Sequence, residues 1–378
     1  MLFIKNGYVK TMAGNDIANG CILIGDNGKI EAIGEELTPP IGATILDAEG
    51  RLVTPGCVEA HCHIGLSDLS GVDFNESSST LTPEMRAIDG INPQNESFAN
   101  AIQGGVTTVC TGPGSANVLC GSFVAMKCYG KRIDDMIIKN PVAMKCAFGE
   151  NPKKNRGQSG ASPKTRMAIA AILREFLFKA KKYYNDKVSG KEPAFDFKLE
   201  AMLPVMAGEI PLKAHVHRAD DIFTAIRIAK EFDVKLTLDH CTAGAFIAEE
   251  LAQEGYPALV GPTMTATTKY ELLGNSFDTP ATLYDAGVDI AIITDAEVIQ
   301  IQHLPLVAGM AVKAGLPVDV AWKAITANAA SIMGIADRVG SLEVGKDGDV
   351  VVWNADPLNQ IGADVFATII DGKIVYQA

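Results

Sequence analysis

The sequence predicts an α/β protein, a (β/α)8 TIM barrel that carries a small composite β-sandwich domain built from both chain ends. Two observations predict the barrel: eight short apolar runs separated by helical patterns, and metal-ligating side chains that follow several of these runs. A third observation, strand-like segments at both ends of the chain, predicts the smaller domain. We therefore expect a β domain of residues 1–52 and 339–378 and a barrel of residues 53–338.

The two chain ends share a pattern of short strands separated by turn signals. At the start, runs such as Leu2–Ile4 are separated by segments such as Asp26-Asn27-Gly28. The tail from about Val339 continues in the same style, with the strand-like run Val350–Trp353 and the hairpin signal Asp371-Gly372. Neither end can bury both faces of a sheet alone, which predicts that the two ends form one domain.

Eight apolar runs between the two ends have the length and composition of buried strands. They are Leu52–Val58, Thr107–Cys110, Phe123–Lys127, Val142–Ala147, Leu212–Val216, Lys235–Asp239, Ala258–Gly261 and Asp289–Thr294. Helical patterns fit between them. Ser162-Pro163 has the form of an N-cap followed by a first turn, and Asp220-Asp221 suits the positive start of another helix. Alternating strands and helices predict that all eight strands run parallel in a closed barrel.

Composition limits the classes of partner. The 378 residues carry 33 basic and 45 acidic side chains, a net charge of -12, which disfavours nucleic acid and anionic membrane surfaces. No apolar run approaches the roughly 20 residues of a membrane span, and the first residues do not form a signal peptide. The 8 scattered cysteines suit reduced thiols. We expect a cytoplasmic protein with a small-molecule substrate, and a homo-oligomer is compatible with these features.

Candidate metal ligands follow four of the predicted strands, although the chain has only 6 histidines. These ligands are His61 and His63, His215, His240, and Asp295. On an extended segment, residues two positions apart point to the same side, so His61 and His63 can bind the same metal ion. The carboxyl ends of barrel strands meet at one mouth, where active sites of this fold lie. Imidazoles with one carboxylate suit zinc, and iron, manganese and cobalt also fit.

At these residues the chain resembles the amidohydrolase superfamily of metal-dependent hydrolases over nearly its whole length. The motifs are Val53-Thr54-Pro55-Gly56 with His61-Cys62-His63, Lys213-Ala214-His215, Leu238-Asp239-His240, Ile293-Thr294-Asp295 and Gly340–Asp349. The segments Phe148–Lys153 and His215–Ile222 resemble its imidazolonepropionase-like and prolidase-like branches. The resemblance implies one or two divalent ions, zinc first, with the four histidines as ligands. It also implies that Asp295 is both ligand and general base.

Binuclear members of the superfamily add a carboxylated lysine on the fourth strand. Lys145 stands in the fourth predicted strand, where a bare buried cation would be costly. However, 70 positions separate Lys145 from His215, more than one helical connection needs. Three alternatives stay open: Lys145 is the ligand; Lys145 lies on strand three and Glu150 is the metal-facing carboxylate, as in amino-sugar phosphate deacetylases; or neither residue binds metal and Lys145 forms an ion pair.

Further polar residues are candidates for contact with substrate. His217 is one alternation past His215, so it could orient a reacting carbonyl or donate to the intermediate, or else pack as an ordinary histidine. Arg218 and Lys153 could bind a substrate carboxylate, although surface ion pairs would equally explain them. Glu150 is the remaining substrate-binding candidate.

The chemistry suited to this set is hydrolysis of a C–N bond. A metal ion lowers the pKa of water towards about 7, and Asp295 can accept the water proton. The expected substrate is a small cyclic amide, an N-acyl amino acid or a dipeptide. Deamination of a heterocycle is the enzymatic alternative. A non-catalytic binding protein is the other alternative, and the intact set of four histidines and one aspartate argues against it.

Overall fold

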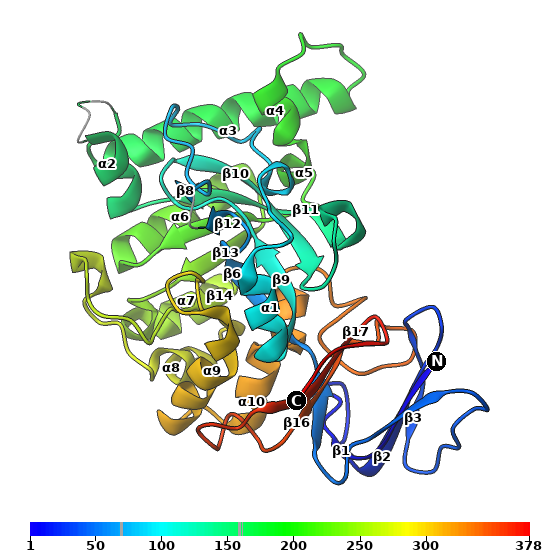
Figure 1. The fold of residues 1–378 in the computed structure, drawn as a ribbon. Helices are drawn as coiled ribbons and strands as arrows, with labels where there is room; N and C mark the ends of the chain where they lie inside the picture. Colours follow the sequence, from blue (N-terminus) through cyan, green and yellow to red (C-terminus); the bar gives the residue numbers. More distant parts are fainter. Residues whose placement is uncertain (69–70, 158–159, 161) are drawn as a thin grey trace.

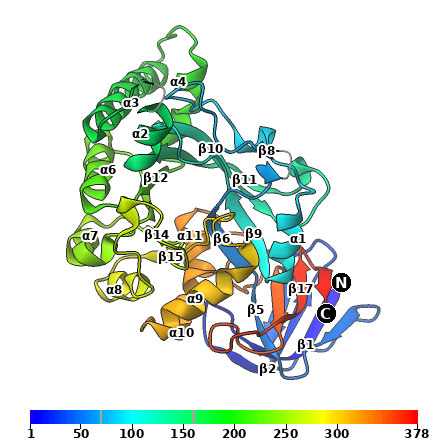
Figure 2. The same cartoon turned by 60° about the vertical axis from the view of Figure 1, so that its left-hand side comes forward.

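The computed structural model describes residues 1–68, 71–157, 160 and 162–378, and these form two large sheets with covering helices (Figure 1). In this part of the chain, no helix combines the length and the apolar character that crossing a membrane requires. Both chain ends lie in the same lower part of the molecule in both views (Figures 1 and 2).

Strands from both chain ends pair in one eight-stranded sheet. Its members are β1 (Leu2–Val9), β2 (Ile17–Ile24), β3 (Ile30–Gly34), β4 (Thr44–Asp47), β5 (Leu52–Pro55), β16 (Val350–Trp353), β17 (Val365–Ile370) and β18 (Lys373–Gln377). The order is β18-β17-β16-β5-β1-β2-β3, and β4 pairs with β1. The sandwich arrangement and the domain limits 1–52, 339–378 and 53–338 stay predictions.

The second sheet is the α/β barrel, and each predicted run overlaps one of its strands. The strands are β6 (Cys57–Cys62), β9 (Val106–Thr111), β10 (Leu119–Lys127), β11 (Ile137–Ala147), β12 (Leu212–Val216), β13 (Leu236–His240), β14 (Ala258–Val260) and β15 (Ile290–Ile292). They follow the chain in the order β6-β9-β10-β11-β12-β13-β14-β15, the strand order of a TIM barrel.

One strand of the barrel runs in the opposite direction to the one predicted. β10 is antiparallel to both β9 and β11, so the expectation of eight parallel strands is wrong at this point. Residues 128–136 are the whole link between β10 and β11. A parallel crossover needs about a dozen or more residues, whereas a short link suffices for an antiparallel pair.

The first predicted strand, Leu52–Val58, is two strands that belong to different sheets. β5 pairs with β1 and β16, whereas β6 pairs with β9. Gly56 stands between them, and a Cβ atom there would lie 2.0 Å from the Thr107 hydroxyl oxygen. Only glycine therefore allows the chain to pass this closely to β9 as it enters the barrel.

A buried carboxylate spans the seam between the first and last barrel strands. Glu59 on β6 accepts hydrogen bonds from the backbone N–H of His61 at 3.0 Å and of Thr294 at 2.8 Å. The Thr294 hydroxyl also donates to it at 2.6 Å. Burial raises the pKa of Glu59 to about 7, although these donors act in the opposite direction. Glu59 thus fixes the relative position of two segments that carry candidate ligands.

Helices and short elements cover the barrel (Figure 2). The helices are α1 (Glu96–Gln103), α2 (Glu150–Gly157), α3 (Arg166–Val188), α4 (Phe197–Ala201), α5 (Leu203–Met206), α6 (Ala219–Phe232), α7 (Ala248–Glu254), α8 (Thr279–Asp285), α9 (Leu304–Lys313), α10 (Val318–Ala324) and α11 (Ala327–Ile332). The short elements are β7 (Ser67–Asp68), β8 (Gly71–Val72), η1 (Ala87–Asp89), η2 (Ile133–Asp135), η3 (Gly244–Ile247), η4 (Tyr270–Leu272) and η5 (Ile301–His303).

The helix starts only partly match the sequence expectation. Asp220 and Asp221 lie in the first turn of α6, as predicted. The N-cap of α3 is Thr165 rather than Ser162, because the Thr165 side chain accepts a hydrogen bond from the backbone N–H of Ala168 at 3.1 Å.

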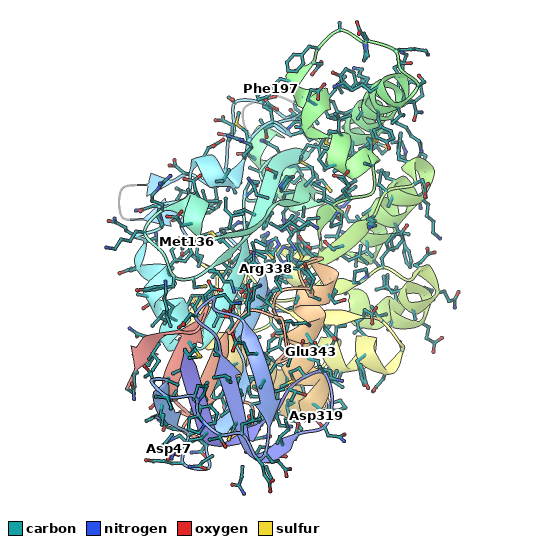
Figure 3. All side chains as sticks on the ribbon, turned by 90° about the vertical axis from the view of Figure 1, so that its right-hand side faces the viewer. Asp47, Met136, Phe197, Asp319, Arg338 and Glu343 are labelled. Atoms are coloured by element: carbon teal, nitrogen blue, oxygen red, sulfur yellow. The ribbon has the colours of Figure 1, made fainter. Side chains whose placement is uncertain are left out.

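Ion pairs join the composite sheet to the barrel. Lys127 on β10 lies 2.8 Å from Asp347 and 2.6 Å from Asp349, all of them buried. Lys10 pairs with Asp319 of α10 at 2.9 Å; Figure 3 shows Asp319 beside the composite sheet. These contacts hold the two sheets in a fixed relation.

Candidate metal centre

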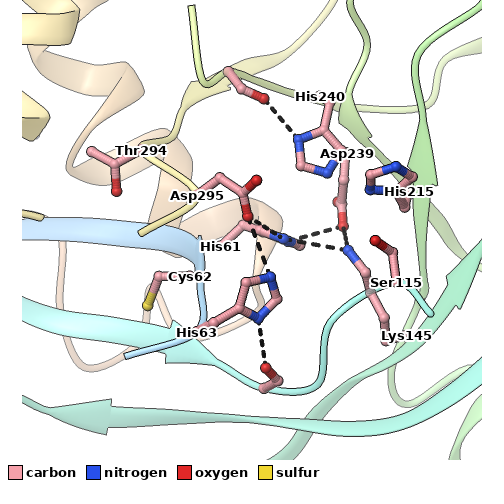
Figure 4. A network of polar contacts seen from close by, with 12 residues as sticks. His61, Cys62, His63, Ser115, Lys145, His215, Asp239, His240, Thr294 and Asp295 are labelled. Carbon is pink, nitrogen blue, oxygen red and sulfur yellow. Dashed lines mark hydrogen bonds and ion pairs between the residues drawn. The ribbon is translucent and has the colours of Figure 1, made fainter. Parts of the chain in front are cut away.

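Candidate ligands from several barrel strands converge at one end of the barrel (Figure 4). β6 contains His61 and is followed by His63, β12 carries His215 and β13 ends at His240. Asp295 follows β15. The convergence that parallel strand ends predict therefore occurs, and it places these side chains in two groups, each with ligand atoms within 4.8 Å of one another.

The first group consists of His61, His63 and Asp295. The Oδ1 atom of Asp295 lies 3.4 Å from Nε2 of His61 and 3.3 Å from Nε2 of His63. Nδ1 of His63 is 2.7 Å from the carbonyl oxygen of Gly112, which fits an Nδ1–H donor and leaves the Nε2 lone pair for a metal.

The second group consists of His215, His217 and His240. Nδ1 of His240 lies 2.8 Å from the carbonyl oxygen of Gly261, and Nδ1 of His217 lies 2.8 Å from the Thr242 hydroxyl. Among the described residues, the Nε2 atoms of His217 and His240 are buried without a hydrogen-bond partner. Buried polar atoms normally have partners, so these two nitrogens fit a site completed by a metal ion or a substrate.

The protonation states also suit metal binding. Burial lowers the pKa of His61 to about 4 and holds the pKa values of His215, His217 and His240 well below the usual range. These imidazoles are therefore neutral near pH 7, the form that binds metal. Burial alone would raise the pKa of Asp295, but the contacts with His61 and His63 hold it well below its usual range, so the carboxylate is ionised.

A buried charge network lies beneath the first group. The Lys145 ammonium is 3.0 Å from Asp239 and 3.3 Å from Nε2 of His61. Asp239 also contacts Lys213 at 3.2 Å and Nδ1 of His61 at 3.0 Å. β11 is the fourth strand of the barrel and pairs with β12, so the alternative placement of Lys145 on strand three is wrong. Asp239 and Lys213 of this network were not singled out from the sequence.

A second carboxylate near the second group comes from a loop. Glu271 in η4 is buried, and its Oε1 atom lies 3.9 Å from Nε2 of His217 and 4.0 Å from Nε2 of His215. Glu150 lies behind it and donates its backbone N–H to Glu271 at 2.8 Å. Sequence reasoning missed Glu271 because no strand-end pattern precedes it.

All three predicted substrate-binding residues, Arg218, Lys153 and Glu150, lie outside the cavity that the metal ligands line. Arg218 and Lys153 line a neighbouring pocket that also contains Glu150 and Tyr270. The Arg218 guanidinium binds Asp220 through two hydrogen bonds of 2.8 and 3.0 Å. The cavity itself has a volume of about 400 Å³, enough for a small molecule. Its functional lining is His63, Ser115, Asn151, His215, His217, Lys269, Asp295 and Glu297.

Comparisons with a family model and with known proteins point to the same family. The family model described as "Amidohydrolase family" matches residues 52–375. The amidohydrolase tasK of Hapsidospora irregularis is 30% identical over 88% of this chain, but the chain spans only 37% of tasK. An imidazolonepropionase of Klebsiella pneumoniae is 24% identical over 87% of this chain and 85% of its own length.

Two further similarities cover almost the whole chain. A 5-methylthioadenosine/S-adenosylhomocysteine deaminase of Caldicellulosiruptor saccharolyticus is 23% identical over 99% of this chain and 93% of its own length. The crystal structure of an amidohydrolase from Thermotoga maritima superposes with a TM-score of 0.95, at 38% identity and complete coverage of both chains.

Proposed function

The chain belongs to the amidohydrolase family and is a metal-dependent hydrolytic enzyme, and from this premise we propose the bond that it cleaves. The proposed reaction is hydrolysis of a C–N bond in a small cyclic amide, an N-acyl amino acid or a dipeptide. One observation carries the proposal: both groups of candidate ligands have members that line one small cavity, with the buried, neutral His215 and His217 and the ionised Asp295 among them. We also propose that the enzyme acts in the cytoplasm.

The proposed metal ligands are the residues His61, His63, Lys145, His215, His240 and Asp295. Zinc is the first candidate, because imidazole with carboxylate suits it. When bound, the ion supplies a hydroxide nucleophile at neutral pH and polarises the substrate carbonyl. The buried Nε2 atom of His240 has no hydrogen-bond partner among the described residues, and this supports the assignment, since coordination would provide a partner.

Asp295 and His217 are the proposed catalytic residues. The ionised Asp295 faces the cavity and can accept a proton from the attacking water, then return it to the leaving nitrogen. His217 can orient the reacting carbonyl through Nε2, provided that the Thr242 hydroxyl donates to its Nδ1 atom.

Lys145 is proposed to be carboxylated when two ions are bound. Its amine is buried between Asp239 and His61, where a carbamate would bring negative charge to the metal ligands. The neighbouring Lys213 would then keep Asp239 as its own ion-pair partner. This arrangement would replace the surplus positive charge of two lysine cations sharing one carboxylate by a surplus negative charge, which divalent metal ions would compensate.

Deamination of a heterocycle is the second candidate. The same groups could attack an amidine carbon and release ammonia, and the similarity to a protein named as a deaminase supports this alternative. Glu271, close to His215 and His217, could accept a hydrogen bond from a ring N–H.

A substrate panel tests the proposal. Metal-replete protein should hydrolyse at least one member of a set of cyclic amides, N-acyl amino acids and dipeptides, with activity abolished by chelator and restored by zinc, manganese or cobalt. Elemental analysis should give one to two divalent ions per chain. Turnover confined to aminated heterocycles would establish the deaminase instead, and metal that cannot be loaded would contradict both.

A further inference from the structure

We propose that Lys269 binds a carboxylate of the substrate, which makes the substrate a small amide with a free carboxylate near the scissile bond. The inference rests on the proposed hydrolytic function and narrows it to N-acyl amino acids and related acids.

Lys269 supplies positive charge inside the cavity. It precedes η4, and among the described residues that line this cavity it is the only lysine or arginine. Its side chain is 24% exposed and lines the cavity. A carboxylate entering the cavity therefore meets one fixed cation besides the metal site.

Other basic side chains near the site are committed elsewhere. Lys145 and Lys213 are fully buried and share Asp239. Arg218 and Lys153 line the neighbouring pocket, so their charges do not face the candidate ligands within the cavity.

The surroundings of Lys269 hold its ammonium in place and leave it able to donate. Nζ lies 2.8 Å from Oδ1 of Asn151 and 3.3 Å from Oε1 of Glu271. An ammonium has three donors, so these two contacts leave one for a ligand. Glu271 also accepts the backbone N–H of Glu150 at 2.8 Å, so its charge is not devoted to Lys269 alone. Glu271 is thus a positioning residue for the cation.

The distances match a short substrate. The Glu271 oxygen that contacts Lys269 is also 3.9 Å from Nε2 of His217 and 4.0 Å from Nε2 of His215. The ammonium is therefore separated from the candidate reaction centre by a single carboxylate. In an N-acyl amino acid, three bonds separate the scissile carbonyl carbon from the carboxylate carbon. This separation is comparable to that between the Lys269 ammonium and the candidate reaction centre. One ammonium with neutral donors suits a monoanion, whereas phosphate recognition commonly uses arginine clusters.

A matched pair of substrates tests the role of Lys269. Wild type and the variants Lys269→Met, Lys269→Arg and Lys313→Met are assayed on N-acetyl amino acids and on the corresponding C-terminal amides. Lys313 lies on the exposed side of α9 and serves as the control for loss of a charge. Loss of a hydrogen bond to a charged group should lower kcat/KM for the acid by about 10- to 150-fold in Lys269→Met. The amide should change little, Lys269→Arg should keep most of the preference, and metal content should stay constant. Rising salt should increase KM for the acid only.

Several results would overturn the inference while leaving hydrolysis intact. The first is that wild type has the same kcat/KM for the acid and the amide. The second is that Lys269→Met lowers kcat/KM equally for both substrates. The third is that Arg218→Met, rather than Lys269→Met, removes the preference for the acid. If no member of the panel is hydrolysed, calorimetric titration of the metal-loaded wild type and Lys269→Met with an N-acetyl amino acid separates the questions. Binding that depends on Lys269 would uphold the inference although the proposed function fails, and binding without that dependence, or none, would overturn it.

Discussion

Replacing Asp239 by Asn removes the one carboxylate that two fully buried lysines share. Asp239 contacts Lys145 at 3.0 Å and Lys213 at 3.2 Å, and none of the three is exposed to solvent. Burial alone would raise the pKa of Asp239, but the two lysines hold it well below its usual range. The variant keeps the side-chain shape and loses only the charge, so the change reports on buried electrostatics.

The size of the effect follows from burial of the lysines. Removal of one partner from a buried ion pair costs about 3–5 kcal/mol, because it leaves a charge without compensation. An unfolding entropy of about 2.1 cal/mol/K per residue gives about 0.8 kcal/mol/K for a chain of this length. We therefore expect Asp239→Asn to lower Tm by about 4–6 °C.

Thermal denaturation of chelator-treated protein measures this effect without the added stabilisation of bound metal. Asp337→Asn, at an exposed carboxylate, is the control and should leave Tm nearly unchanged. Adding Lys213→Met to Asp239→Asn should recover part of the loss, because it removes one of the stranded cations. An unchanged Tm in Asp239→Asn would refute the reasoning, since the lysines could then not be buried cations paired to this carboxylate.

Further predictions concern catalysis, metal content and pH. Asp295→Asn should keep most of its metal while the rate falls about 100- to 10,000-fold, and near-normal turnover of the metal-replete variant would place the base elsewhere. Lys145→Ala should lose about one metal equivalent and recover partly with a small added carboxylate; unchanged metal content would remove its bridging role. Burial alone would raise the pKa of Asp347, but the ion pair with Lys127 outweighs this effect and lowers the pKa from 3.8 to about 2. Asp347→Asn should therefore cost about 2 kcal/mol above pH 4, with the difference vanishing towards pH 2 in urea titrations.

The sequence by itself determined the barrel and the convergence of its candidate ligands. His61, His63, His215, His240 and Asp295 each lie at or just after the end of an apolar run, which places them at strand ends. Parallel strands place their carboxyl ends together, so local pattern was enough to predict their proximity. The family followed from the same residues, and it is confirmed by the match over residues 52–375.

Only the tertiary structure decided features that depend on contacts between distant segments. The reversal of β10 and the division at Gly56 come from a short link and from close packing against Thr107, neither of which alters hydrophobic periodicity. Lys269 reaches the cavity, and Glu271 approaches His215 and His217, from a loop that contacts α2. From the sequence, Arg218 was a candidate for binding a substrate carboxylate. In the structure its guanidinium donates a hydrogen bond to Asp220 and lines the neighbouring pocket. Local pattern fixes where a strand side chain points, whereas a loop side chain is placed by partners that are remote in sequence.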